Sequence, residues 1–146
     1  MSKIEDFLTA AEEQDIVEAI RVAELNTSGE IRVHIERTSN REATDRALEL
    51  FHTLKMDNTK LQNAVLIYLA IDDKTFVIYG DQGINKVVEH DFWDCTKDIM
   101  QSHFKNGQFK QGLVEGILRS GERLKHYFPY TDDDDANELT NEISKG

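Results

Sequence analysis

An unbroken run of apolar positions lies near the middle of the chain. Residues 64–71 are eight apolar residues in a row, rich in β-branched and aromatic side chains. The run does not alternate and is too short for most helices, so it predicts a strand buried on both faces. A polar break at residues 72–74 separates it from a second β-rich run, 75–79. Two such runs joined by a short polar turn predict a hairpin.

Upstream of this run, the pattern predicts a helix and then a strand. Thr9 and Glu12 have the spacing of a capping box, which predicts the start of a helix that ends near the turn-rich residues 26–29. Residues 30–36 then alternate strictly between polar and apolar side chains. This alternation predicts a strand with one buried face.

A second helix is expected between this strand and the central run. Residues 39–42 have the form of another capping box, and the positions after them carry an apolar stripe up to Leu54. Strand, helix and central strand form a β-α-β unit, so the first two strands are expected to be parallel, with a right-handed crossover. The hairpin makes the third strand antiparallel to the second, and the predicted fold class is α/β with a mixed sheet flanked by helices.

Two more helices are expected downstream, followed by an acidic tail. One should begin at Asp91 and end near residues 106–107, and the last should cover residues 109–128. Small residues recur every four positions in the last helix, which predicts close packing on a neighbouring element; they are Gly112, Gly116 and Ser120. Residues 1–130 are expected to form one domain, and the acidic, polar residues 131–146 a largely disordered tail.

Composition narrows the classes of partner. The chain has 146 residues, 39% hydrophobic content and a net charge of −11, which argues against nucleic acid or an anionic membrane as a partner and is compatible with cations. The single cysteine, Cys95, cannot form an internal disulfide, and its apolar neighbours favour a buried structural role. Residues 1–25 lack the apolar core of a signal peptide, and no apolar run approaches the ~20 residues of a membrane span. A cytoplasmic monomer is the default expectation.

The chemistry-bearing residues are carboxylates at strand ends. The sequence contains no zinc-binding spacing of histidines, no Walker loop and no nucleophile elbow. In open α/β sheets, ligands usually bind at the carboxyl ends of the parallel strands. The predicted topology places residues 38–40 at this edge, together with Asp72 and Asp73. The opposite edge gathers Glu30 and Asp81, with Asp91 expected nearby. Oxygen ligands without sulfur or imidazole suit Ca²⁺ or Mg²⁺, although acidic turns also arise simply because Asp forms Asx turns.

Six short motifs in order also make residues 5–128 resemble the TPM domain family, which includes a thylakoid-lumen acid phosphatase of photosystem II repair. They are residues 27–31 (TSGEI), 63–66 (NAVL), 72–74 (DDK), 80–83 (GDQG), Asp91, and 104–109 (FKNGQF) with Gly112. The resemblance implies an α/β sandwich, divalent-cation binding in several members and acid phosphatase activity in some. It also implies cation ligands: first Asp72 and Asp73, then Glu30, Asp81 and Asp91. Lys74 stands where the family has an arginine able to grip phosphate, which weakens the phosphatase inference.

Three functional classes follow from these observations. The favoured one is a Ca²⁺- or Mg²⁺-binding accessory module with no chemistry of its own. The alternatives are a metal-assisted acid phosphatase, in which the cation polarises a phosphoryl oxygen and activates water, and a protein-interaction adaptor that uses the acidic tail and the small-residue helix face.

Overall fold

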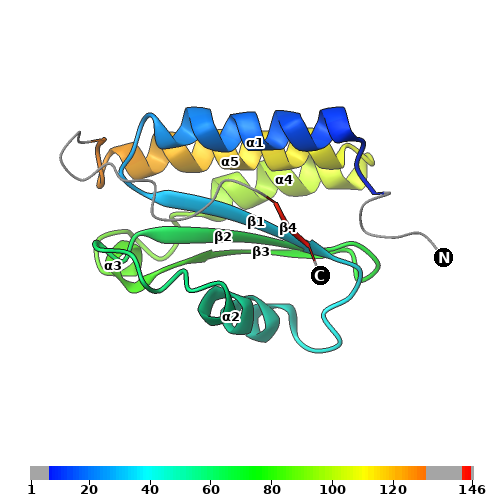
Figure 1. Cartoon of the computed structure of the whole chain (residues 1–146), viewed down its shortest axis with the longest axis horizontal. Coiled ribbons are helices and arrows are strands. Elements are labelled where there is room, and N and C mark those ends of the chain that lie inside the picture. Colours follow the sequence, from blue (N-terminus) through cyan, green and yellow to red (C-terminus); the bar gives the residue numbers. More distant parts are fainter. Residues whose placement is uncertain (1–6, 131–142, 146) are drawn as a thin grey trace.

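The computed structural model describes residues 7–130 and 143–145 and forms three layers, with a sheet between helices (Figure 1). Its elements are, in order, α1 (Ala10–Glu24), β1 (Glu30–Glu36), α2 (Ala43–Thr53), β2 (Ala64–Ala70), β3 (Thr75–Gly80), α3 (Gln82–Asn85), α4 (Asp94–Lys105), α5 (Phe109–Lys125) and β4 (Ser144–Lys145). The four strands are arranged in the order β3-β2-β1-β4.

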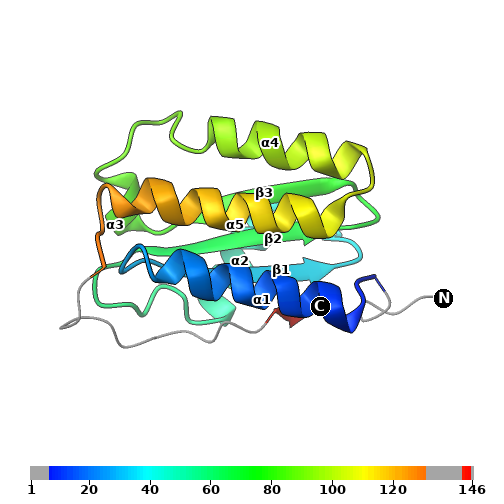
Figure 2. The same cartoon turned by 90° about the horizontal axis from the view of Figure 1, so that it is seen from above.

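The sheet confirms the predicted pairing. β1 and β2 are parallel, with Glu30 opposite Ala64 and Glu36 opposite Ala70, and β2 and β3 are antiparallel. All seven residues of β2 are buried, as expected for a strand covered on both faces. Helices α1, α4 and α5 cover one face of the sheet and α2 crosses the other (Figures 1 and 2).

Two apolar cores lie on the two faces of the sheet. The larger joins α1, α4 and α5 to one face of the strands and includes Ile31 and Ile67. The smaller lies under α2 and includes Phe51 and Tyr68. Because side chains alternate along a strand, successive residues of β2 enter different cores.

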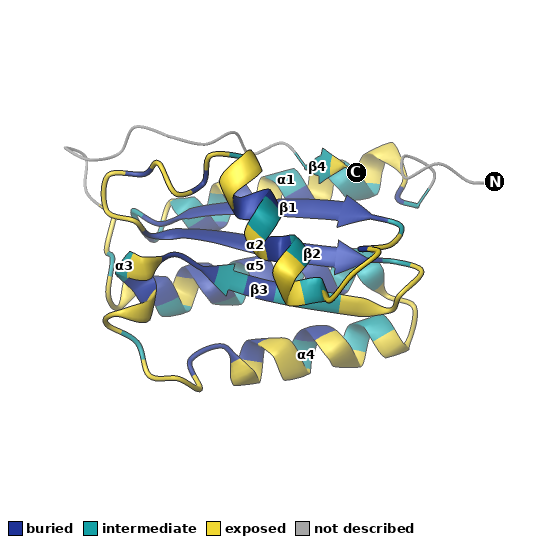
Figure 3. Cartoon of the chain, turned by 90° about the horizontal axis from the view of Figure 1, so that it is seen from below, coloured by how far each residue is buried: buried dark blue, intermediate teal, exposed yellow. Residues whose placement is uncertain are grey.

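The polar face of β1 differs from the prediction that only one face of this strand is buried. Glu30, His34 and Glu36 are all buried (Figure 3). Since side chains alternate and the apolar residues between them enter the larger core, they lie on the side of the sheet that α2 crosses. β4 adds a further strand beside β1. Strict alternation therefore marks two faces of different chemistry here, one apolar and one polar, and both are covered.

Of the first three predicted helix starts, one is confirmed and two differ in the structure. The capping box at Thr9 is confirmed, with reciprocal bonds between Thr9 and Glu12. The second box, at residues 39–42, is wrong: Glu42 is the N-cap of α2 and accepts a hydrogen bond from the backbone N–H of Asp45. The helix expected to begin at Asp91 begins at Asp94, because residues 89–94 form turns first.

The short helix α3 was not predicted. Residues 80–83 were interpreted as a glycine turn, but Asp81 caps α3 instead. Gly83 lies so close to the preceding loop that an added Cβ atom would approach the carbonyl oxygen of Leu61 to 2.2 Å. This glycine is therefore required by the close approach of two backbones.

The close packing predicted for the last helix is confirmed. A Cβ atom on Gly112 would approach Phe104 to 2.5 Å, and one on Gly116 would approach Met100 to 2.4 Å. Both contacts join α5 to α4. Ser120 donates a hydrogen bond to the carbonyl oxygen of Gly116 within the same helix.

The end of the chain contains a short strand that was not predicted, and Cys95 differs from expectation. Most of the predicted disordered tail, 131–142 and 146, lies outside the described residues, whereas Ser144 and Lys145 form the strand β4 parallel to β1. Cys95 is exposed, not buried, and its Sγ atom accepts a hydrogen bond from Arg119 at 3.1 Å.

Among the described helices, none combines the length and the apolar character needed to cross a membrane.

Candidate functional site

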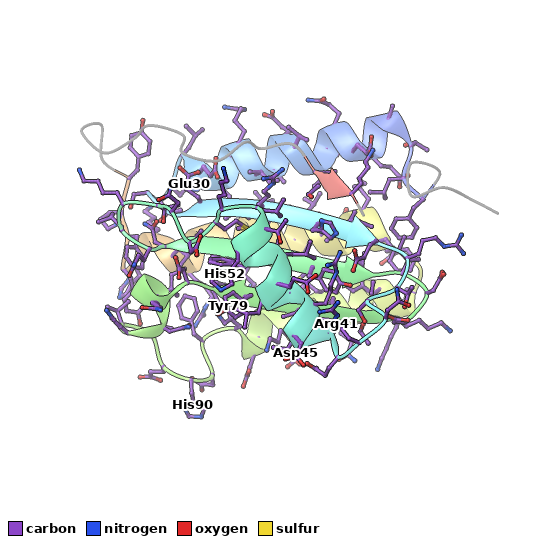
Figure 4. All side chains as sticks on the ribbon, turned by 60° about the horizontal axis from the view of Figure 1, so that its bottom comes forward. Glu30, Arg41, Asp45, His52, Tyr79 and His90 are labelled. Atoms are coloured by element: carbon purple, nitrogen blue, oxygen red, sulfur yellow. The ribbon has the colours of Figure 1, made fainter. Side chains whose placement is uncertain are left out.

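The predicted site residues divide between the two ends of the sheet. Asp72 and Asp73 lie in the hairpin turn at the carboxyl ends of β1 and β2, whereas Glu30 and Asp81 lie at the amino ends. Figure 4 shows this separation through Glu30 at one end and Arg41, which precedes α2, at the other. At ~3.3 Å per residue, the length of β1 keeps the two ends ~20 Å apart.

At the carboxyl end, the carboxylate of Asp73 is fully engaged by the neighbouring loop. It accepts hydrogen bonds from the backbone N–H of Ser39 at 2.9 Å, the hydroxyl of Ser39 at 3.1 Å and the hydroxyl of Thr38 at 2.9 Å. The bond from the backbone of Ser39, followed by that from Thr38, lowers the pKa of Asp73. The predicted contact between residues 38–40 and the acidic turn is therefore present, but it is made by hydrogen bonds within the protein.

Asp72 turns away from Asp73 towards an arginine. Its Oδ2 atom accepts a hydrogen bond from Arg37 Nε at 3.1 Å. The repulsion expected between two adjacent carboxylates is thus relieved by two different sets of donors, without need of a cation.

A cavity of about 470 Å³ adjoins this turn and is lined by Glu36, Arg37, Thr38, Ser39, Asn40, Arg41 and Arg46. Three of its lining residues are arginines. Arg41 pairs with Glu49 at 2.5 Å, and Arg46 pairs with both Glu36 and Glu49. The cavity can therefore present guanidinium groups to an anion, in competition with its own carboxylates.

A buried polar network that the sequence analysis did not identify lies beside the cavity. Glu36 accepts hydrogen bonds from Arg46 at 2.9 Å through two nitrogens, from the hydroxyl of Tyr68 at 2.5 Å, and lies 3.1 Å from His34 Nε2. The second ring nitrogen of His34 lies 2.8 Å from the hydroxyl of Ser144. The only hint in the sequence was the single hydroxyl of Tyr68 inside an apolar run, which lies directly opposite His34 in the parallel register.

The electrostatics of this network keep one carboxylate charged and one imidazole neutral. Burial alone would raise the pKa of Glu36, but hydrogen bonds from Arg46, Tyr68 and His34 outweigh it and lower the pKa to about 2. Burial lowers the pKa of His34 despite the nearby carboxylate of Glu36. Burial and then the bond to Glu36 raise the pKa of Tyr68.

At the amino end, Glu30 of β1 and Ala64 of β2 lie beside Asp81, which directly follows β3. Glu30 pairs with Ala64, and the backbone N–H of Asp81 donates to the carbonyl oxygen of Ala64 at 3.0 Å. Alternation places Asp81 on the same face as Tyr79, and burial, then the charge of Asp81, raises the pKa of Tyr79. The two acids thus flank a small alanine on the face that α2 crosses, and both are buried.

The carboxylate of Asp81 is only half satisfied. Its Oδ1 atom accepts a hydrogen bond from the backbone N–H of Gln82 at 2.7 Å, whereas Oδ2 is buried without a partner among the described residues. The hydroxyl of Thr59 is also buried without a partner. The loop 59–63 is bound to the Asp81 turn, since Gly83 N–H donates to the carbonyl oxygen of Gln62 at 2.8 Å. Two orphaned oxygens thus come from two segments that are in contact.

The remaining predicted residue does not join this group. Asp91 is exposed, in the turns before α4. Across residues 7–130 and 143–145, no three His, Cys, Asp or Glu side chains gather as they would to hold a metal ion without further ligands. A cation at the amino end would therefore need hydroxyl, carbonyl or water oxygens beside Asp81, a mixture that suits Ca²⁺ and Mg²⁺.

Comparison with known proteins identifies the family of this chain. The chain is similar over its full length to the BA42 protein from the psychrophilic bacterium Bizionia argentinensis, with 65% identity, 100% of each chain covered and a TM-score of 0.92. It shares its fold with the N-terminal domain of a protein from P. gingivalis, at 22% identity, with 86% of this chain and 81% of that chain covered and a TM-score of 0.70. No curated protein matches the sequence. The model of the TPM domain matches residues 2–123, and the chain belongs to the TPM domain family.

Proposed function

We propose that this chain is a divalent-cation-binding TPM domain whose site lies at the amino end of the sheet, around Asp81. One observation carries the proposal: the Oδ2 atom of Asp81 is buried and has no hydrogen-bond partner among the described residues. A buried carboxylate oxygen without a donor is costly, and a bound cation relieves that cost.

The surroundings of Asp81 provide the oxygens that a hard cation prefers. Glu30 supplies a second carboxylate on the same face, and the orphaned hydroxyl of Thr59 lies in the adjoining loop. With so few charged ligands, we expect weak affinity, on the order of 10⁻⁴–10⁻³ M, and only a modest preference between Ca²⁺ and Mg²⁺. Asp72 and Asp73 fit this role less well, because both carboxylates already accept hydrogen bonds.

A titration with Ca²⁺ and Mg²⁺, followed by amide NMR and thermal unfolding, tests the proposal. Asp81→Asn should abolish binding, and the amide shifts in the wild type should centre on residues 59–64 and 80–84. At a hundredfold excess of metal over the dissociation constant, the stability gain should be about 2.7 kcal/mol in the wild type and absent in the variant.

The matched control is the double variant Asp72→Asn, Asp73→Asn, which removes two carboxylates at the other end of the sheet. It should bind as the wild type does. If this control loses binding while Asp81→Asn retains it, the cation site lies in the hairpin turn and the proposal is wrong. Unchanged spectra and melting temperatures in the wild type would remove cation binding altogether.

The cavity lined by Arg37, Arg41 and Arg46 favours a second candidate, a phosphatase acting at the carboxyl end. Its guanidinium groups suit a phosphoryl group. A cation at Asp81 would lie too far away to assist, given the ~20 Å between the ends of the sheet. Turnover of p-nitrophenyl phosphate by the wild type, with and without Mg²⁺, tests this candidate, and no turnover in either condition removes it.

The adaptor alternative loses one of its two supports. Gly112 and Gly116 are packed against α4 inside the chain, so this small-residue face is not free to receive a partner. The other support, the acidic run 132–135, lies outside the described residues.

A further inference from the structure

A second cavity, separate from the arginine-lined one, opens beside the hairpin on the face of the sheet that α4 and α5 cover. It measures about 480 Å³, within the range of small-molecule sites. Its walls come from β2, the hairpin turn, β3, and the junction between α4 and α5. The lining residues used below are Leu69, Lys74, Phe76, Phe104, Lys105 and Phe109.

The interior of this cavity is apolar and aromatic. Phe76 contacts Phe104 edge to face with a centroid separation of 5.1 Å, and Phe104 stacks on Phe109 at 5.7 Å. Leu69 closes the base from the sheet and is buried. Phenylalanine rings lack polar atoms, so a ligand here must present an apolar body.

Two lysines stand at the mouth of the cavity. Lys74 comes from the hairpin turn and Lys105 from the end of α4, and both are exposed. Neither forms an ion pair with any residue in the described parts of the chain. The acids next to Lys74 are directed elsewhere, Asp72 to Arg37 and Asp73 to the loop at Thr38. In a chain of net charge −11, two cations without an ion pair among the described residues thus lie beside one apolar cavity.

We propose that this cavity binds a small amphipathic anion, with an aliphatic or aromatic body between the phenylalanines and a carboxylate between Lys74 and Lys105. Charge complementarity selects this occupant over a neutral or cationic apolar molecule. The enclosed volume selects a small molecule over a folded partner. The site is independent of the cation proposed at Asp81, since the two lie at opposite ends of the sheet.

The experiment uses the full chain with EDTA present and decanoate as the probe. Decanoate should displace the fluorescent aromatic sulfonate ANS, and amide shifts should centre on residues 69–76 and 101–109. Decyltrimethylammonium, with the same tail and the opposite charge, should not compete. The double variant Lys74→Asn, Lys105→Gln should bind decanoate about tenfold more weakly at low salt, from the loss of two exposed ion pairs. Asparagine is chosen at position 74 because the backbone there is left-handed, with φ of 54°, which asparagine tolerates.

The matched control is Lys97→Gln with Lys125→Gln, which removes two exposed lysines outside the cavity and should leave binding unchanged. A second variant, Gln101→Trp, adds bulk to the cavity lining from an exposed position of α4 and should block decanoate even if the lysine variant is unstable. Failure of decanoate to bind overturns the proposal. The proposal is also overturned if the two lysine double variants weaken decanoate binding equally, or if decanol binds as tightly as decanoate. Amide shifts induced by decanoate that centre elsewhere would overturn it as well. Displacement of ANS only by an acidic peptide, and not by decanoate, would make the cavity a peptide site and would also overturn it.

Discussion

The carboxylate of Glu36 shows how a buried charge is accommodated in this fold. It accepts hydrogen bonds from Arg46 and Tyr68 and contacts His34, and it is almost completely buried. A buried charge is tolerated only when most of its hydrogen-bonding capacity is used. Glu36 therefore depends on partners from β1, α2 and β2 at once.

We expect Glu36→Gln to destabilise the protein by about 3 kcal/mol at pH 7. The figure follows from a pKa lowered from 4.5 to about 2, at 1.36 kcal/mol per unit. Because the folded-state pKa is depressed, this stability is present above pH ~4.5 and is lost as the pH falls towards ~2. Urea unfolding from pH 7 to pH 2 should show a shallower acid limb in the variant.

Glu49→Gln is the control for that measurement. Glu49 shares Arg46 with Glu36, but its side chain is 41% exposed. Exposed ion pairs contribute about 0–1 kcal/mol, so this variant should change stability little and keep the acid limb. Equal effects of the two substitutions would show that burial of Glu36 does not set its contribution.

Residue by residue, the sequence indicated which acids lie at strand ends but not how they are bonded. Asp72 and Asp73 lie in the predicted turn, yet their donors come from residues 37–39, which are about 35 positions away along the chain. Whether the Oδ2 atom of Asp81 finds a partner depends on the neighbouring loop 59–63. The local sequence pattern therefore could not predict that this oxygen has none among the described residues. Exposure of Cys95 was mispredicted because its apolar neighbours in sequence face a different side of α4.

At the scale of elements, periodicity was most reliable where packing is regular. The apolar run of β2 was predicted from its lack of alternation, the β-α-β crossover from the order of the elements, and the close packing of α5 from small residues spaced four apart. The strand β4 has only two residues and pairs with β1 across more than 100 positions, so no local pattern could indicate it. The same holds for α3, which is four residues long.

The close contact between α5 and α1 gives a prediction for Gly121. A Cβ atom at this position would approach the Cβ atom of Ala23 to 2.7 Å and its Cα atom to 2.9 Å. Backbone cannot move aside as a side chain can. Gly121→Ala should therefore destabilise by about 1–3 kcal/mol, despite the ~1 kcal/mol that alanine gains in helix propensity.

Gly116→Ala provides the comparison within the same helix. Its added Cβ atom would meet only the flexible side chain of Met100. Met100 can change rotamer, so this substitution should cost less than Gly121→Ala in chemical unfolding. A larger loss at Gly116 would show that the α4–α5 contact is the more rigid of the two.

Across the whole molecule, positive and negative groups are distributed unevenly. The net charge is −11, yet Arg37, Arg41 and Arg46 line one cavity and Lys74 and Lys105 another. Both basic sites lie at the carboxyl end of the parallel strands, and the half-satisfied carboxylate of Asp81 lies at the amino end. The two proposals therefore assign ligands of opposite sign to the two ends, anions to one and a cation to the other.

The large net charge also makes stability depend on salt. Self-repulsion among 28 acidic side chains, only partly offset by 17 basic ones, should weaken as NaCl shortens the Debye length to ~10 Å at 0.1 M and ~3 Å at 1 M. The exposed ion pairs that salt also screens contribute little. Raising NaCl should therefore raise the melting temperature by a few degrees, since ~1 kcal/mol corresponds to ~2–4 °C at this size.

This salt effect separates general screening from a cation site. At equal ionic strength, CaCl₂ should raise the melting temperature of the wild type further than NaCl does, because site binding adds to screening. Asp81→Asn should keep the NaCl response and lose only the additional part. A fall in melting temperature with NaCl would mean that exposed ion pairs such as Arg41–Glu49 outweigh the repulsion, and a calcium gain equal to that of NaCl in the wild type would mean that calcium acts by screening alone.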